Sequence, residues 1–219
     1  MIKVTHAKVF NIDNAIIGMR NPMNSWDKSD TKDDIIGPKD MDLAHRLIDA
    51  GSPNDKFLRQ ILVSMQITGP LYWWKEMDTY KVATTANSTS TMHKLTSKPI
   101  TMEDFGINLD PMKLDYDNIQ VFDTDPYAYD NHLADVWEYI IEACEALRDK
   151  FNKTKDERYW RALIQLLPES YNQTRMWTAD YETLRNIYRW RHNHKLTEWR
   201  EFCEFITNEL PYGKDLIAY

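Results

Sequence analysis

One stretch past the middle of this 219-residue chain constrains the fold most, because its apolar residues repeat with the period of an α-helix. They are spaced three and four positions apart and so form one continuous stripe along a helix: Leu133, Val136, Trp137, Ile140, Ile141, Cys144 and Leu147. Similar patterns predict helices over about 155–167, 181–192 and 196–209. The second half of the chain is therefore predicted to be mostly helical.

Three shorter stretches have the pattern of strands. Residues 2–10 alternate in part between apolar and polar side chains, and residues 60–68 form a short run of aliphatic and β-branched residues. Residues 172–178 are also expected to be extended. Together these stretches predict a small sheet.

Helices are expected between and after the first two strands. A short helix is predicted over 13–20 and a longer one from Asp40 to Ala50, where Gly51 occupies a position that commonly ends a helix. Gly69-Pro70 ends the second strand, and the proline suits the first turn of a helix over 71–80.

The order of these elements predicts an α/β or α+β fold, in which a small mixed sheet is flanked by long helices. We expect a single domain over residues 1–219, with loops at 21–39 and 96–130 and one short helix at 101–105. Residues 81–91 have short side chains, many hydroxyl groups and no periodicity. They are interpreted either as a polar surface loop or as a loop that binds a nucleotide.

Charge and cysteine content exclude several classes of protein. The net charge of −7 argues against binding to nucleic-acid polymers, although a small anionic ligand needs only one local group of donors. Cys144 and Cys203 lie in helical patterns and are expected to be free, buried thiols rather than a disulfide. No metal site is expected, because His192 and His194 are two positions apart and face different sides of a helix.

The sequence also argues against a membrane protein. No stretch approaches the roughly 18 consecutive apolar residues of a membrane span. The first residues lack the apolar run of a signal peptide. Together with the free thiols, these features predict a cytoplasmic protein.

Two longer stretches carry an order of elements that is found in a known family. Residues 47–95 contain a helix end, a strand, the Gly69-Pro70 helix start and a Lys94-Leu95 tail without gaps between them. Residues 166–206 keep a second pattern at eight positions: Leu167, Pro168, Thr174, Trp177, Leu184, Asn186, Arg191 and Trp199. In spacing and element order the chain resembles the flavin-dependent thymidylate synthases, often called ThyX, over about two-fifths of its length.

The resemblance implies flavin contacts at positions where most of the family's residues are replaced. The family's Arg-His-Arg segment matches Thr79, Tyr80 and Lys81, so one cation stands where the family has two arginines. Without the arginine pair, this segment has no bidentate grip on a phosphate. Lys56 and Arg59 lie in the segment 54–59, which matches another flavin contact of the family. Both are interpreted either as contacts to the flavin pyrophosphate or as solvated cations near a helix end.

A further flavin contact of the family, Asn-x-Arg, matches Asp180 and Glu182. Two carboxylates near an anionic cofactor would lower its affinity, because like charges repel. The resemblance therefore implies a neutralising partner here, for which Arg175 and Arg185 are the candidates.

The resemblance also implies a nucleotide site. The family's Ser-Gly-Arg phosphate contact matches Thr89, Ser90 and Thr91, whose hydroxyl groups can still cradle a phosphate. Arg191 matches an arginine that meets the pyrimidine, and Glu76 matches a glutamine that binds the nucleotide. An arginine beside uracil carbonyl groups stabilises enolate charge, but a solvated helix end explains Arg191 as well.

For function, the preferred hypothesis that follows from the resemblance is enzymatic. It implies a divergent thymidylate synthase-like methyltransferase of nucleotide biosynthesis that binds FAD and a deoxynucleotide such as dUMP, with NADPH and methylenetetrahydrofolate as co-substrates. The family forms homotetramers with active sites between subunits. The alternatives are a catalytically inactive homologue that acts as a binding or scaffolding oligomer, and an unrelated helical protein. No catalytic residue is assigned.

Overall fold

The computed structural model describes residues 1–107 and 133–219, and the chain divides into two compact units. The first unit comprises Met1–Gly69, Trp73–Ser88 and Thr174–Tyr219, and the second comprises Pro70–Tyr72 and Thr89–Gln173. The single domain expected over the whole chain stays a prediction. From position 108 onward, the loop expected at 96–130 lies outside the described residues.

Four strands form one sheet in the order β1-β2-β4-β3. Their bounds are Lys3–Phe10 for β1, Leu62–Pro70 for β2, Thr85–Ser88 for β3 and Asn172–Asp180 for β4. Each strand predicted from the sequence is therefore confirmed. Strand β3 was not expected, because both of its faces are exposed and its residues show no apolar alternation.

The sheet is antiparallel where a mixed sheet was expected. β1 pairs with β2, and β3 with β4, in antiparallel registers. Strand β4 begins beside the end of β2, since the Leu71 amide donates to the Tyr171 carbonyl oxygen at 3.0 Å. Thr68 contacts Thr174 and Ser64 contacts Thr178, so β2 and β4 run in opposite directions.

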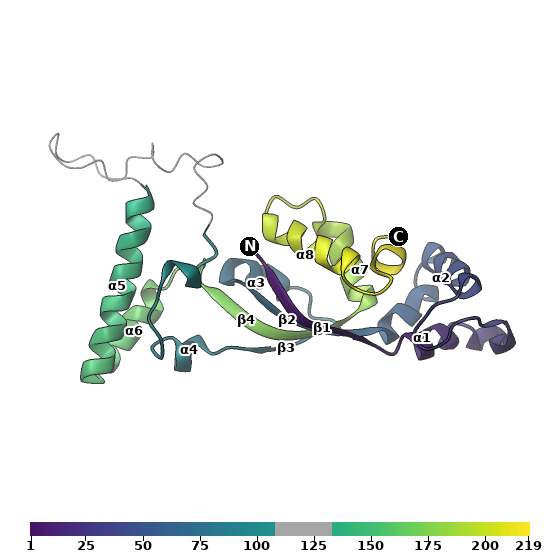
Figure 1. The fold of residues 1–219 in the computed structure, drawn as a ribbon, viewed down its shortest axis with the longest axis horizontal. Helices are drawn as coiled ribbons and strands as arrows, with labels where there is room; N and C mark the ends of the chain where they lie inside the picture. The colour runs from purple at the N-terminus through teal and green to yellow at the C-terminus, as the bar shows by residue number, and fades with distance from the viewer. Residues whose placement is uncertain (108–132) are drawn as a thin grey trace. The chain divides into compact units, whose positions relative to one another are not determined.

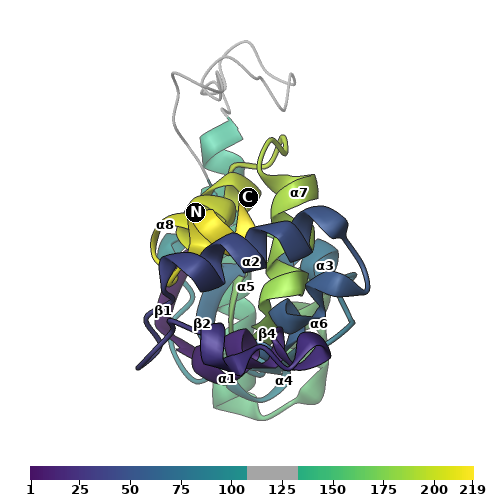
Figure 2. The same cartoon turned by 90° about the vertical axis from the view of Figure 1, so that its right-hand side faces the viewer.

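Helices cover one face of the sheet in the first unit, as Figure 1 and Figure 2 show for α7 and α8. The helices of this unit are α1 (Ile12–Gly18), α2 (Pro38–Ala50), most of α3 (Leu71–Met77), α7 (Tyr181–Arg191) and α8 (Thr197–Asn208). The covered face presents alternate residues of β2 and β4 to the core: Val63, Met65, Ile67, Trp177 and Ala179. An aromatic cluster joins the helices, with the Trp73 ring 5.1 Å from that of Trp199 and 5.7 Å from that of Phe202.

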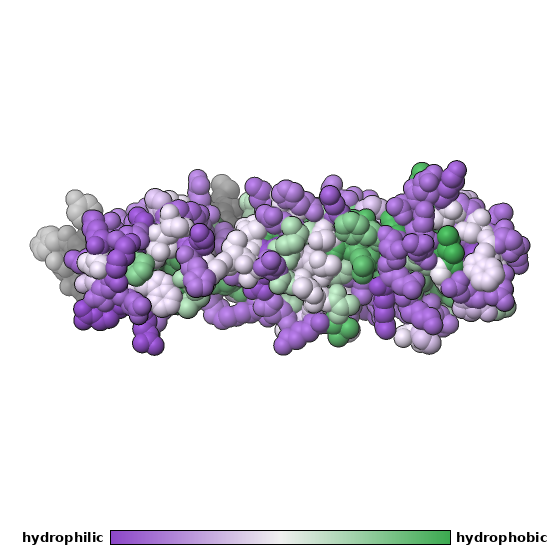
Figure 3. Space-filling model, turned by 90° about the horizontal axis from the view of Figure 1, so that it is seen from below, coloured by the Kyte–Doolittle hydropathy of each residue, from purple (hydrophilic) through white to green (hydrophobic). Residues whose placement is uncertain are grey.

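Within the described part of the first unit, no helix covers the opposite face of the sheet (Figure 1 and Figure 2). Residues that pair directly across the strands share this face, among them Phe10 with Leu62 and Asn87 with Met176. Phe10, Leu62 and Met176 are exposed there beside serine, threonine and glutamine side chains, and Lys3 and Lys8 of β1 share this face. Figure 3 views the molecule from this side and shows hydrophobic and weakly polar residues gathered across its middle.

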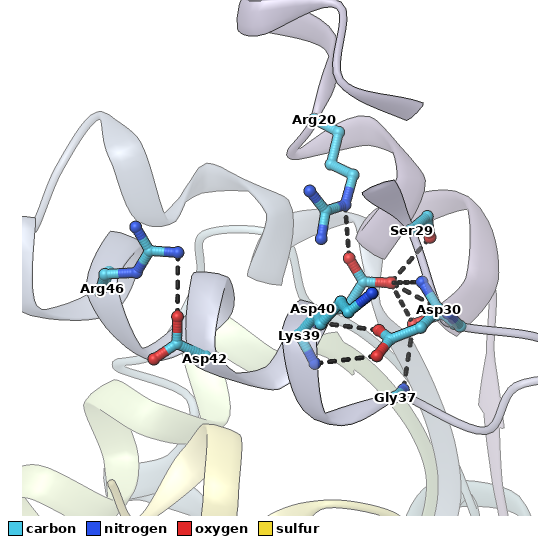
Figure 4. Close-up of polar contacts among 9 residues, drawn as sticks. Arg20, Ser29, Asp30, Gly37, Lys39, Asp40, Asp42 and Arg46 are labelled. Carbon is cyan, nitrogen blue, oxygen red and sulfur yellow. Dashed lines mark hydrogen bonds and ion pairs between the residues drawn. The ribbon is translucent and has the colours of Figure 1, made fainter. Parts of the chain in front are cut away.

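A single buried carboxylate organises the segment before α2, where a loop was expected at 21–39. Asp40 is fully buried, and its oxygens accept hydrogen bonds from Arg20, Ser29, Thr31 and the Asp30 amide (Figure 4). The Arg20 Nε atom lies 2.5 Å from Asp40 Oδ1. Before α2 begins at Pro38, the segment contains short 3-10 turns at Asn21–Met23 and Trp26–Lys28 and an isolated β-bridge between Lys32 and Ile35.

The second unit is mainly helical. It contains α4 (Thr91–Lys94), a 3-10 turn at Met102–Asp104, α5 (Leu133–Thr154) and α6 (Glu157–Leu166). The apolar stripe predicted between 133 and 147 lies on α5, and its Cys144 packs in a core with Leu95, Ile100, Phe105 and Leu163. Among the described residues, no helix has both the length and the apolar content that crossing a bilayer requires.

Candidate functional site

Four side chains from three separate parts of the sequence meet in the first unit, and we call them the Arg191 cluster: Glu76, Tyr80, Arg191 and Trp199. Glu76 lies on α3, and Tyr80 follows the end of that helix. Arg191 is the last residue of α7, and Trp199 lies on α8. Three of the four are residues for which the sequence predicted a ligand contact.

The cluster is held together by charge and by aromatic contact. Arg191 donates to Glu76 Oε2 at 2.8 Å and to the Tyr80 hydroxyl at 3.0 Å. Its guanidinium group lies 4.7 Å from the centre of the Trp199 ring, within the range of a cation–π contact. The indole N–H of buried Trp199 donates to the same Glu76 oxygen at 2.9 Å.

Both charged members of the cluster remain accessible. The side chains of Arg191 and Glu76 keep 20% and 36% of their accessible surface. A guanidinium donor and a carboxylate acceptor side by side match the edge of a uracil ring, which offers carbonyl acceptors next to one N–H donor. Arg191 and Glu76 also satisfy each other's hydrogen-bonding groups within the chain, so the pair can equally be a structural ion pair that binds no ligand.

A cavity of about 430 Å³ lies beside α7 in the same unit, and we call it the α7 pocket. Its walls come from α2, the 3-10 segment Asn54–Gln60, the turn before β3, and the first part of α7. Its polar lining residues are Ser52, Asp55, Arg59, Asp180, Glu182, Thr183, Arg185, Asn186 and Arg189. The volume is in the range of about 300–1,000 Å³ that is usual for small-molecule sites.

Two of the carboxylates in the α7 pocket are occupied by partners. Glu182 accepts two hydrogen bonds from Arg59, one of them 2.9 Å long. Asp180 is buried at the start of α7 and accepts a hydrogen bond from the Thr183 amide at 2.7 Å. It is therefore the N-cap of the helix, and burial raises the pKa of its carboxyl group.

The neutralising partner expected for these carboxylates differs from both candidates. Arg59 pairs with Glu182, whereas Arg175 pairs with Asp78 at 2.7 Å. Arg185 lines the pocket but forms no ion pair among the described residues. The sequence did not indicate this outcome, because Arg59 and Glu182 are 123 positions apart.

Of the pocket's polar side chains, Arg189 was not predicted to be a site residue, Arg185 was named only as a neutralising partner, and Asp55 was named only as part of the matched segment 54–59. Arg185 and Arg189 lie one turn apart on α7 and both line the cavity. Asp55 is only 8% exposed, and its Oδ1 atom has no hydrogen-bond partner among the described residues. The i, i+4 spacing of Arg185 and Arg189 in the sequence could have predicted an anion site, but the same spacing is also typical of a solvated helix face.

The remaining predicted flavin contacts lie near these two arrangements. Lys56 and Lys81 are exposed, and they are the chain neighbours of Asp55 and Tyr80 respectively. The Thr79 hydroxyl donates to the backbone oxygen of Glu76 at 2.7 Å, so it is used at the end of α3.

Three predicted phosphate contacts belong to the second unit. Thr89, Ser90 and Thr91 come directly after β3. The Ser90 hydroxyl caps α4 by accepting from the His93 amide at 3.1 Å, and the Thr89 backbone oxygen accepts from Gln173 at 2.9 Å.

Other expectations can be compared with the described residues. Cys144 and Cys203 are free and buried, as predicted, and burial raises the pKa of Cys203 to about 12. In the described ranges, no three His, Cys, Asp or Glu side chains lie where they would hold a metal ion. Trp73, Trp74 and Trp199 are core residues, whereas Trp190 is 70% exposed on α7.

The arrangement of the chain is similar to that of two solved structures. One is thymidylate synthase X (ThyX) from Helicobacter pylori with FAD and dUMP, at a TM-score of 0.69 and 18% identity, covering 99% of this chain and 97% of that one. The other is flavin-dependent thymidylate synthase ThyX from the same organism, complexed with FAD and dUMP, at a TM-score of 0.65 and 18% identity, covering 99% and 96%. No protein-family model and no curated protein matches the sequence. The predicted fold is confirmed.

Proposed function

We propose that this chain, which has the ThyX fold, is a divergent flavin-dependent protein that binds a deoxynucleotide such as dUMP at the Arg191 cluster and FAD in the α7 pocket. The observation that carries the proposal is the Arg191 cluster, in which residues 115 positions apart form one donor–acceptor pair. Both similar structures contain FAD and dUMP. Because the identity to these structures is only 18%, the ligands proposed for this chain depend on its own side chains.

For the nucleotide, the cluster offers complementary groups. Arg191 donates to a uracil carbonyl oxygen, and Glu76 accepts from the neighbouring N–H of the ring. A guanidinium group at this place stabilises negative charge that develops on the carbonyl oxygen during a reaction at the pyrimidine. The Trp199 ring beneath the guanidinium fixes its orientation, so less freedom is lost when the nucleotide binds.

For the cofactor, the donor set of the α7 pocket fits a large polar ligand. Two buried polar atoms in its wall, Asp55 Oδ1 and Arg185 Nε, have no hydrogen-bond partner among the described residues. Such atoms are costly unless a ligand or water satisfies them. The pairing of Glu182 with Arg59 removes the repulsion that two free carboxylates would exert on an anionic cofactor.

When bound, FAD in its reduced form would supply the hydride for a one-carbon transfer, so the proposed chemistry requires no protein nucleophile. The chain's part is to orient the pyrimidine through Arg191 and Glu76, and to hold the cofactor in the pocket. Loss of the Arg-His-Arg segment therefore weakens binding without removing a reacting group. Methylenetetrahydrofolate and NADPH are the co-substrates of the proposed reaction, and a reducing cytoplasm is its expected compartment.

The proposed assembly is a homotetramer. The uncovered face of the sheet carries three exposed apolar side chains among polar ones, and two exposed lysines, Lys3 and Lys8, lie on it at β1. The apolar part of this face is suited to burial against another subunit, and the two lysines would then lie at the rim or pair with acidic side chains. In this proposal, the active sites are completed where subunits meet.

The first test is nucleotide affinity. Replacing Arg191 by Ala removes the guanidinium group that would donate to the uracil carbonyl oxygen and that orients Glu76. We therefore expect dUMP affinity, measured by calorimetry, to fall about 10- to 100-fold. The matched control is Arg46→Ala, because Arg46 is an exposed arginine paired with Asp42 outside both sites. Equal dUMP affinity in the two variants would overturn the nucleotide assignment.

The second test separates the enzyme from the alternative of a non-catalytic binding oligomer. The observation favouring that alternative is that Arg191 is already satisfied by Glu76 and Tyr80. The assay supplies dUMP, methylenetetrahydrofolate, NADPH and FAD, and follows formation of dTMP. Protein that binds FAD and dUMP but forms no dTMP supports the binding oligomer.

A further inference from the structure

The α7 pocket has two arginines, Arg185 and Arg189, that form no ion pair among the described residues. Arg185 and Arg189 are four positions apart, so they project from the same face of the helix about 6 Å apart along its axis. Arg59 is taken by Glu182, and Asp180 caps the helix.

The surroundings of Arg185 destabilise its positive charge. Burial lowers its pKa, and the charge of Arg189 lowers it further, while Asp55, Asp49 and Glu182 oppose these effects from a distance. Its Nη2 atom donates to the Tyr219 backbone oxygen at 3.2 Å, but its Nε atom is buried without a partner among the described residues. An anion in the pocket would relieve both the repulsion and the unmet donor.

A second, independent feature points to a ligand in the same cavity. Asp55 is nine-tenths buried, and its Oδ1 atom accepts no hydrogen bond from the described residues. A carboxylate oxygen in that state requires a donor. A ligand that carries hydroxyl groups beside its phosphates would satisfy the arginines and Asp55 together.

We propose that Arg185 and Arg189 bind the diphosphate of a nucleoside diphosphate group in the α7 pocket. This inference rests on the proposed function, because the diphosphate of FAD is the ligand that the function supplies. The two planar guanidinium groups replace the grip that the chain lacks at Thr79, Tyr80 and Lys81. In this proposal the phosphates are bound by side chains of α7, whereas in the family they are bound by the segment that corresponds to Thr79, Tyr80 and Lys81.

The experiment measures the affinity of three probes: FAD, ADP and riboflavin. ADP carries the diphosphate without the flavin, and riboflavin carries the flavin without a phosphate. Arg189→Gln and Arg185→Gln should each weaken FAD and ADP binding at least tenfold, and riboflavin binding should stay unchanged. Arg46→Gln is the matched control, since it removes an equal charge from the surface outside the pocket.

The outcomes separate this inference from the proposed function. FAD and ADP affinities that are unchanged in both variants overturn the inference, while FAD binding by the wild type keeps the proposed function. ADP binding that depends on both arginines, in a protein that binds no flavin, supports the inference and overturns the flavin proposal. If neither ADP nor FAD binds the wild type, the inference is wrong. Arg189 is exposed, so its variant is informative even if Arg185→Gln does not fold.

Discussion

Asp40 illustrates how one side chain decides the conformation of a whole segment. Its carboxylate gathers five hydrogen bonds from Arg20, Ser29, Asp30 and Thr31, and both Asp40 and Arg20 are buried. Burial alone would raise the pKa of Asp40, but the hydrogen bonds outweigh that effect and hold the pKa below its ordinary value. The ionised carboxylate is therefore part of the folded state.

We predict that Asp40→Asn lowers the free energy of unfolding by roughly 3–5 kcal/mol, because Arg20 then stays buried without its counter-charge. The pKa of Asp40 is lower in the folded chain than in the unfolded one. Its stabilisation is thus complete above about pH 4 and is lost as the pH falls through the folded-state pKa. Urea unfolding between pH 3 and pH 7 measures both effects.

The control for this prediction is Asp42→Asn, which breaks an exposed ion pair with Arg46 and should change stability by about 0.5 kcal/mol or less. A wild type and an Asp40→Asn variant that lose stability equally below pH 4 would contradict the role given to Asp40.

At the scale of elements, α7 contributes to both candidate sites. Its first turn is capped by Asp180, its exposed side carries Arg185 and Arg189, and its last residue is Arg191. The helix therefore sets the relative position of the α7 pocket and the Arg191 cluster. Replacing the N-cap residue Asp180 should therefore lower the stability of α7 through the lost capping hydrogen bond rather than through the lost charge.

We predict that Asp180→Ala destabilises the protein by about 1 kcal/mol, because the Thr183 amide loses its capping acceptor. Asp180→Asn keeps an acceptor of similar capping strength and should stay near wild-type stability. Thermal unfolding of the two variants provides the comparison. A destabilisation of equal size in both would show that the charge of Asp180, not its capping, matters.

Most elements were predictable because their patterns are local. The stripe on α5, the Gly51 end of α2 and the aliphatic run of β2 each show their period within one segment. Strand β3 was not predictable in this way, because neither of its faces is buried. The antiparallel direction of the sheet could not be predicted either, because it depends on where β4 begins relative to β2, and a local sequence pattern does not show this.

The candidate site was predictable only where the resemblance assigned residues. It nominated Glu76, Tyr80 and Arg191, which the structure brings together. The partner of Glu182 was missed, because the ion pair joins segments that are distant in sequence. Asp55 was missed as well, since an unpaired buried oxygen can be recognised only when its surroundings are known.

At the scale of the whole molecule, self-association is the property that most affects the proposed function. We predict a tetramer in sedimentation velocity, and a smaller species when Leu62 and Met176 are both replaced by Lys, because two charges then replace the apolar side chains on a face that already carries Lys3 and Lys8. Met23→Lys is the control, since Met23 is more exposed but lies outside the sheet. A wild type that sediments as a monomer at all concentrations would rule out the proposed assembly.

Trp190 gives the molecule a built-in optical reporter. Its ring is largely in water, and its N–H is tied at 3.1 Å to Asn186, which lines the α7 pocket. An indole in water emits at longer wavelength than the buried indoles of Trp73, Trp74 and Trp199, and Trp190 shares this property with the half-exposed Trp26. Replacing Trp26 by Phe leaves the long-wavelength emission of Trp190 to be followed. A flavin in the pocket would absorb that emission, and occupancy of the pocket can then be followed by quenching without any label.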